Sequence, residues 1–131
     1  MRYGVWLSRF CLALIFLLNG FGVIDQTRAT QELAAHGAPA RLLPLLVVGG
    51  RIVQIIAGTA LLLGVKERLA ALALAAFLVP ASVMAHDFWA YHGAEFQGQL
   101  VNFTKNLAML GGLLFVVFRG ADDAMARSQR Q

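Results

Sequence analysis

Apolar residues run along the chain in four long stretches, with short groups of polar and charged residues between them. The stretches cover about residues 5–24, 42–65, 69–89 and 100–118. A helix needs about 20 predominantly apolar residues to cross a bilayer, so each stretch predicts one transmembrane helix. The first also resembles a signal peptide with a poor cleavage site at Thr27 to Ala29, but its length and Asn19-Gly20 favour a retained helix. The polar tail over residues 119–131 is expected outside the membrane.

The lengths of the connections predict how these helices are arranged. The second connection, Gly64 to Arg68, is so short that the second and third helices must be antiparallel neighbours. The first connection, Asp25 to Arg41, is the longest. Within it, the segment Thr30 to His36 is followed by Gly37-Ala-Pro39, which is a helix-stop pattern. We therefore expect an all-α, antiparallel four-helix bundle with a short surface helix between the first and second spans, on the non-cytoplasmic side.

The composition excludes a soluble domain of this length. Of the 131 residues, 59% are hydrophobic and 14% are charged, compared with roughly 45–50% and 25% in globular proteins. A chain this small has too much surface for its volume to bury so many apolar side chains, and disordered segments are polar and charged. We therefore expect a single integral membrane domain over residues 1–131, with the lipid bilayer as a partner.

The formal net charge of +4 comes from basic residues scattered along the chain, without the basic and aromatic stripe that would indicate nucleic acid binding. Cytoplasmic loops of membrane proteins carry an excess of Lys and Arg. Seven basic residues fall at one end of the expected bundle and three at the other. The seven are Arg2, Arg9, Lys66, Arg68, Arg119, Arg127 and Arg130, and the three are Arg28, Arg41 and Lys105. Both termini are therefore expected in the cytoplasm, and the protein in a bacterial inner membrane.

Several polar residues fall at membrane depth, where charged side chains are costly and usually face the interior of a bundle. Arg51 lies nine residues into the second stretch, roughly 13 Å deep at the rise of an α-helix. Gln54 and Gly58 follow on the same helix face, and Gly58 is expected to let a neighbouring helix approach closely. The expected topology places further polar residues in the same half of the bundle, the half that faces away from the cytoplasm. They are Asn19, His86, Asp87, Asn102, Lys105 and Asn106.

This convergence has two interpretations. The first is a network of ion pairs and amides that locks the helices together, with Asp87 paired to Lys105 or Arg51. The second is a small polar pocket for a quinone headgroup or a small anion. No nucleophile with a base, phosphate loop or carboxylate dyad is present, so a partner or a bound cofactor would have to supply reactive atoms. Neither metal nor haem is expected, because the spacing of the histidines fits no ligand pattern and Cys11 is the single cysteine.

Several motifs give the chain a resemblance to a known family. They are His86-Asp-Phe-Trp89, Asn102-Phe-Thr-Lys-Asn-Leu-Ala-Met-Leu-Gly-Gly-Leu114, Asn19-Gly20, the segment from His36 to Pro39, and Gln54 to Gly64. With these the chain resembles the DoxX family of small bacterial membrane proteins, from Val5 to about Phe118. The resemblance implies a four-helix bundle and a redox association, because the family takes its name from a membrane subunit of a thiosulfate–quinone oxidoreductase. Other members are linked to oxidative-stress or thiol-handling complexes.

The chain departs from the family pattern at two places. The family often carries Glu where Gln54 stands, and a basic residue shortly after the glycine that matches Gly20, where this chain has Phe21 to Ile24. An intramembrane Glu–Lys pair is therefore not expected, and Arg51 is the candidate to compensate for it. This departure puts a proton-coupled role in doubt.

The resemblance and the polar residues together predict a membrane subunit that supports electron transfer to quinone. It would anchor a redox protein partner or form a headgroup site, either alone or as a homo-oligomer. In the headgroup site Arg51 and Lys105 would donate hydrogen bonds to quinone oxygens, Asp87 would orient one of them, and His86 would relay a proton. The alternatives are a non-catalytic structural or assembly subunit and a small-solute carrier, although no inverted repeat is present.

Overall fold

The computed structural model describes residues 2–25 and 27–128, and within them every element is helical. The elements are α1 (Arg2–Gly20), α2 (Thr27–Ala35), α3 (Leu43–Leu63), α4 (Glu67–Ala85), the short 3-10 helix η1 (Phe88–Ala90) and α5 (Gly93–Ser128). Four helices, α1, α3, α4 and α5, are long and apolar enough to cross a membrane. The predicted all-helical membrane fold with four spans is therefore confirmed. Arg130, which contributed to the predicted orientation, lies outside the described residues.

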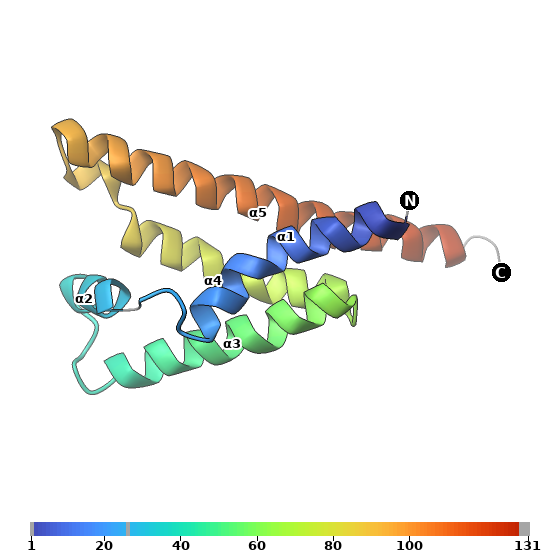
Figure 1. The fold of residues 1–131 in the computed structure, drawn as a ribbon, viewed down its shortest axis with the longest axis horizontal. Helices are drawn as coiled ribbons and strands as arrows, with labels where there is room; N and C mark the ends of the chain where they lie inside the picture. The colour runs from blue at the N-terminus through green and yellow to red at the C-terminus, as the bar shows by residue number, and fades with distance from the viewer. Residues whose placement is uncertain (1, 26, 129–131) are drawn as a thin grey trace.

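The long helices lie along one axis, with the beginning of α1 and the end of α5 at the same end of the bundle (Figure 1). α1 packs against α3, α3 against α4, and α4 against α5. The short turn between α3 and α4 makes them antiparallel neighbours, as predicted. The small α2 lies at the opposite end of the bundle from the termini and contacts both α3 and α4.

The ends of α1 and α5 differ from the predicted spans for identifiable reasons. α1 stops at Gly20, four residues early, because the amides of Gly22 and Val23 turn back to the carbonyls of Asn19 and Leu18. Gly22 adopts a left-handed conformation there, with φ of 75°, as the glycine of a Schellman motif does. α5 begins at Gly93, before the polar group at its predicted start, and remains helical through the polar tail to Ser128.

The core consists of apolar side chains, mostly alanine and leucine, from all four long helices. α1 and α3 approach closely at two glycines: a Cβ atom on Gly58 would lie 3.1 Å from the Leu17 side chain, and one on Gly20 would lie 2.7 Å from that of Ile55. The close helix approach predicted at Gly58 is thus confirmed. The fully buried core residues with no exposed surface are Ala13, Leu61, Ala71, Leu74 and Leu113. Large apolar side chains such as Leu63 and Phe115 cover the outside, which is the surface that lipid solvates.

Candidate functional site: an apolar cavity beside a polar network

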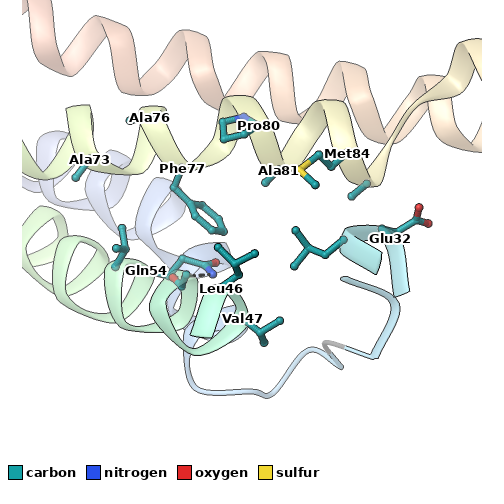
Figure 2. A pocket seen from close by; sticks show the side chains of 14 residues that line it. Glu32, Leu46, Val47, Gln54, Ala73, Ala76, Phe77, Pro80, Ala81 and Met84 are labelled. Atoms are coloured by element: carbon teal, nitrogen blue, oxygen red, sulfur yellow. Dashed lines mark hydrogen bonds between the residues drawn. The ribbon is translucent and has the colours of Figure 1, made fainter. Parts of the chain in front are cut away.

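A cavity of about 610 Å³ lies between α2, α3 and α4. Figure 2 shows its side chains, which are almost all apolar, projecting from the three helices into one space. The lining residues include Leu33 and Glu32 from α2, Gly50 and Gln54 from α3, and Phe77, Pro80, Ala81 and Met84 from α4. The volume is in the range of about 300–1,000 Å³ typical of small-molecule sites. Of the residues predicted to form a binding site, only Gln54 lines this cavity.

The cavity exists because the wall formed by α4 carries small side chains. Ala73, Ala76 and Ala81 line it, and alanine leaves space that a leucine would fill. Phe77 crosses to α3, where its ring lies against Gly50: a Cβ atom there would come within 3.0 Å of the ring. Phe77 therefore bounds the cavity, and the alanines on either side of it leave the cavity open.

Gln54 is a buried polar side chain in the wall of this apolar cavity. Gln54 is only 3% exposed. Its amide nitrogen donates a 3.3 Å hydrogen bond to the Gly50 carbonyl one turn earlier in α3. Among the described residues no other hydrogen bond involves the Gln54 amide. An amide has two N–H groups and one acceptor oxygen, so Gln54 retains the capacity to bind a polar group in the cavity.

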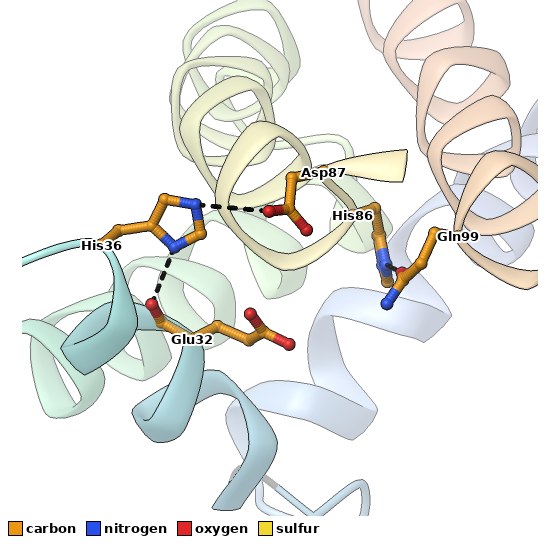
Figure 3. A network of polar contacts seen from close by, with 5 residues as sticks. All are labelled: Glu32, His36, His86, Asp87 and Gln99. Carbon is orange, nitrogen blue, oxygen red and sulfur yellow. Dashed lines mark hydrogen bonds and ion pairs between the residues drawn. The ribbon is translucent and has the colours of Figure 1, made fainter. Parts of the chain in front are cut away.

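A network of polar contacts (Figure 3) includes Glu32, which also lines the cavity. His36 Nδ1 lies 2.9 Å from the Glu32 carbonyl oxygen. Because a carbonyl oxygen can only accept, Nδ1 donates. His36 Nε2 lies 3.9 Å from Asp87 Oδ2, an ion pair when the imidazole is protonated. The other carboxylate oxygen, Asp87 Oδ1, is buried and has no hydrogen-bond partner. This contact ties α2 to the end of α4.

His86 belongs to a second contact of this network, on the side away from α2 (Figure 3). Its Nδ1 lies 2.9 Å from Oε1 of Gln99, a residue of α5 that is only 5% exposed. His86 is also the residue that ends α4, where its amide donates to the Ser82 carbonyl. The two adjacent residues His86 and Asp87 therefore hold α5 and α2, respectively, at the same end of α4.

The partners of His86 and Asp87 were not predicted from the sequence. Gln99 precedes Asn102 and Asn106 by three and seven positions, so the three share one helix face. The polar face of α5 could have been extended to Gln99 had the helix been predicted to begin earlier. The sequence placed His36 at the end of a surface helix but indicated no partner for its side chain. Its position four residues after Glu32 was the available signal for the hydrogen bond within α2.

Arg51 lies away from Asp87, at the end of α1. Its Nε donates a 2.9 Å hydrogen bond to the Gly20 carbonyl, and a Cβ atom on Gly22 would lie 2.5 Å from its guanidinium. Asn19, beside it in α1, is half-buried and donates a 3.0 Å hydrogen bond to the Ile15 carbonyl. The guanidinium therefore satisfies the carbonyl end of a helix, where positive charge is favourable.

The predicted ion pair of Asp87 with Lys105 or Arg51 is wrong, because the described partner of Asp87 is His36. Lys105 is exposed, whereas Asn102 and Asn106 are half-buried. Lys105 lies six positions beyond Gln99 on α5, a rotation of about 240° at 100° per residue. Its side chain therefore leaves the helix on a different face from the residue that contacts α4. Within the described part of the chain, no group of three His, Cys, Asp or Glu residues could hold a metal ion.

The four apolar helices and their lipid-facing surface define a multi-pass integral membrane protein. The sequence model of the DoxX family matches residues 4–87, which is more than half of the chain, so the protein belongs to the DoxX family. It is also similar to the inner membrane protein YphA of Escherichia coli (strain K12), with 25% identity over 115 residues, covering 87% of this chain and 81% of that protein. No solved structure matches the chain significantly. The protein is therefore a multi-pass inner-membrane protein.

Proposed function

We propose that this protein binds a lipid-soluble quinone in the cavity between α2, α3 and α4, as the membrane subunit of a quinone-linked redox complex. The observation that carries the proposal is a buried amide, Gln54, in the wall of a cavity of about 610 Å³ whose other lining side chains are apolar except for Glu32. A quinone is an apolar ring and chain with two carbonyl oxygens. It is best held by apolar walls and a few placed donors.

The residues of the cavity fit such a ligand. The second N–H of Gln54 can donate to a carbonyl oxygen, and the ring of Phe77 offers a flat apolar face on the neighbouring helix. Leu33 and Met84 line the cavity from α2 and α4. Because the exposed surface of these helices is apolar, an isoprenoid chain can leave the cavity directly into the bilayer.

The polar network supplies groups that exchange protons beside the cavity. Conversion of a quinone to its quinol consumes two electrons and two protons. The side chains of His36 and Asp87 carry exchangeable protons at the end of α4, and they lie next to the cavity because His36 donates to the backbone carbonyl of Glu32, a residue that lines it. The electrons would come from an associated redox protein.

The roles proposed for individual residues differ from those expected from sequence. Gln54 replaces Arg51 and Lys105 as the donor, because Gln54 lines the cavity and neither basic residue does. His36 joins Asp87 as a proton-exchanging group. His86 is assigned a positioning role, since its imidazole is bonded to Gln99.

The test is purification in mild detergent followed by mass spectrometry of bound quinone, for the parent protein and variants inside and outside the cavity. Gln54→Leu should reduce quinone affinity about 5- to 10-fold, the equivalent of one buried hydrogen bond. Ser82→Ala is the control, because Ser82 is also buried and bonded to a carbonyl one turn earlier in its own helix, but it does not line the cavity. Ala81→Phe, which adds a ring inside the cavity, should reduce retention. Parent protein without quinone, or equal retention in all three variants, would refute the proposal.

A structural or assembly subunit is the second candidate. It is favoured by the contacts that join helix ends: Arg9 with Glu67, and Arg51 with Gly20. This function predicts that the protein captures a redox partner with no quinone bound, and that Gln54→Leu leaves the capture unchanged.

A further inference from the structure

A second cavity, of about 660 Å³, lies at the end of the bundle that contains the termini. It is bounded by the first half of α1, the second half of the transmembrane part of α5, and the beginning of α4. These parts of α1 and α5 run beside one another in Figure 1. The two helices touch where Leu12 packs on Gly112, since a Cβ atom there would lie 2.9 Å from the leucine side chain. The cavity extends from this contact toward the termini, and it shares no residue with the cavity proposed to bind quinone.

The walls of this cavity divide into an apolar part and a charged rim. Leu12, Phe115 and Val116 form the apolar part, and the Phe115 side chain is 66% exposed, so this part opens to the lipid. Arg9, Ser8, Glu67 and Arg119 form the rim. An apolar groove with polar groups at one end matches an amphiphile lying along the membrane normal.

The rim carries more positive than negative charge. Arg9 forms an ion pair with Glu67 through one terminal guanidinium nitrogen. The buried Nε–H of Arg9 has no hydrogen-bond partner. Arg119 is exposed, and no described residue forms an ion pair with it. Arg119 directly follows the apolar stretch that ends at Phe118, the position at which basic residues commonly meet the headgroup region. Among the described side chains, the rim therefore offers a guanidinium without an ion-pair partner next to the end of an apolar stretch.

We propose that this cavity binds one anionic phospholipid, with the phosphate on Arg119 and an acyl chain along Leu12 and Phe115. Charge complementarity favours this occupant, because basic pockets between transmembrane helices bind the headgroups of anionic lipids. The apolar wall distinguishes a lipid from free phosphate, which would gain nothing from Phe115. The basic residues also predict that this end is cytoplasmic.

The experiment is native mass spectrometry of the full chain in mild detergent, titrated with phosphatidylglycerol or with zwitterionic phosphatidylethanolamine. The parent protein should retain phosphatidylglycerol preferentially, and Arg119→Gln should weaken its binding about fivefold, the contribution of one basic residue near a lipid headgroup. Arg68→Gln is the matched control, because Arg68 is exposed in the first turn of α4 at the same end but does not line the cavity. It should bind phosphatidylglycerol within twofold of the parent.

A further variant and a competitor complete the test. No atom lies within 4 Å of a Cβ placed on Gly4, which lines the cavity one turn before Ser8 of the rim, so Gly4→Phe adds a ring at the headgroup end of the cavity and should weaken binding of phosphatidylglycerol. Excess inorganic phosphate should not displace the lipid. Displacement by phosphate, equal retention of the two lipids, or equal losses in Arg119→Gln and Arg68→Gln would each overturn the proposal.

Discussion

Arg9 and Arg51 occupy corresponding positions at opposite ends of the antiparallel pair α1 and α3. Arg9 of α1 lies against Gly64, the left-handed residue that ends α3, and Arg51 of α3 lies against Gly22, the left-handed residue that follows α1. Each guanidinium would be within 2.5 Å of a Cβ atom on its glycine. The carbonyl end of a helix carries partial negative charge, so each helix supplies the cation that stabilises the end of the other.

Replacing Arg51 by Met should therefore destabilise the fold and spare the cavity. The variant loses the hydrogen bond to the Gly20 carbonyl and the favourable charge at the end of α1, together about 1–3 kcal/mol. Thermal unfolding in detergent measures the loss, and bound quinone is measured on the folded fraction. Arg51→Lys, which retains the charge, should recover part of the stability. A variant of unchanged stability that has lost its quinone would instead make Arg51 a direct ligand, as the sequence first indicated.

Gly64 should resist substitution more strongly than a glycine inside the same helix. Its φ of 71° and its contact with Arg9 both oppose a side chain, so Gly64→Ala should cost about 1–2 kcal/mol of unfolding free energy. Gly49→Ala is the control, because α3 is regular there and nothing lies within 4 Å of the added Cβ. It should be neutral or stabilising by up to about 1 kcal/mol. Urea or thermal unfolding of both variants in one detergent measures the difference, and equal effects would contradict it.

His36 and Asp87 should hold α2 against the end of α4. Removing the ion pair with His36→Gln should increase hydrogen exchange at the α2 amides, with little change in the core of α3 and α4. The effect is expected to be within about 1 kcal/mol, because the histidine side chain is 33% exposed and such pairs are screened by water. His92→Gln, which replaces an exposed histidine outside the network, is the control. Unchanged exchange in α2 would mean that its apolar contacts alone hold it.

The sequence predicted the spans because hydrophobic length is set by the bilayer, and it predicted the antiparallel α3–α4 pair because the turn between them is short. It placed Arg51 and Asp87 at membrane depth by counting residues. It did not predict their partners, because depth along one helix does not specify which neighbour lies beside it. The cavity was also missed: it depends on alanines of α4 lying opposite Gln54, and alanine gives no distinctive signal in a sequence this apolar. The contact between His36 and Asp87 depends on how the connection between α1 and α3 folds, which the sequence pattern does not specify.

Substituting Gln99 should destabilise the fold, whereas substituting Lys105, the residue that the sequence singled out, should have no effect. Lys105 is exposed and has no ion-pair partner among the described residues, so Lys105→Leu should leave both the unfolding temperature and quinone retention unchanged. Gln99→Leu removes the bond to His86 in a buried position and should cost about 1–3 kcal/mol, because the imidazole then lacks its partner. The unfolding temperature and the amount of bound quinone, measured in parallel for the two variants, test this prediction. Loss of quinone in Lys105→Leu would show that α5 presents this lysine to the ligand or to a partner subunit, and would reinstate it as a functional residue.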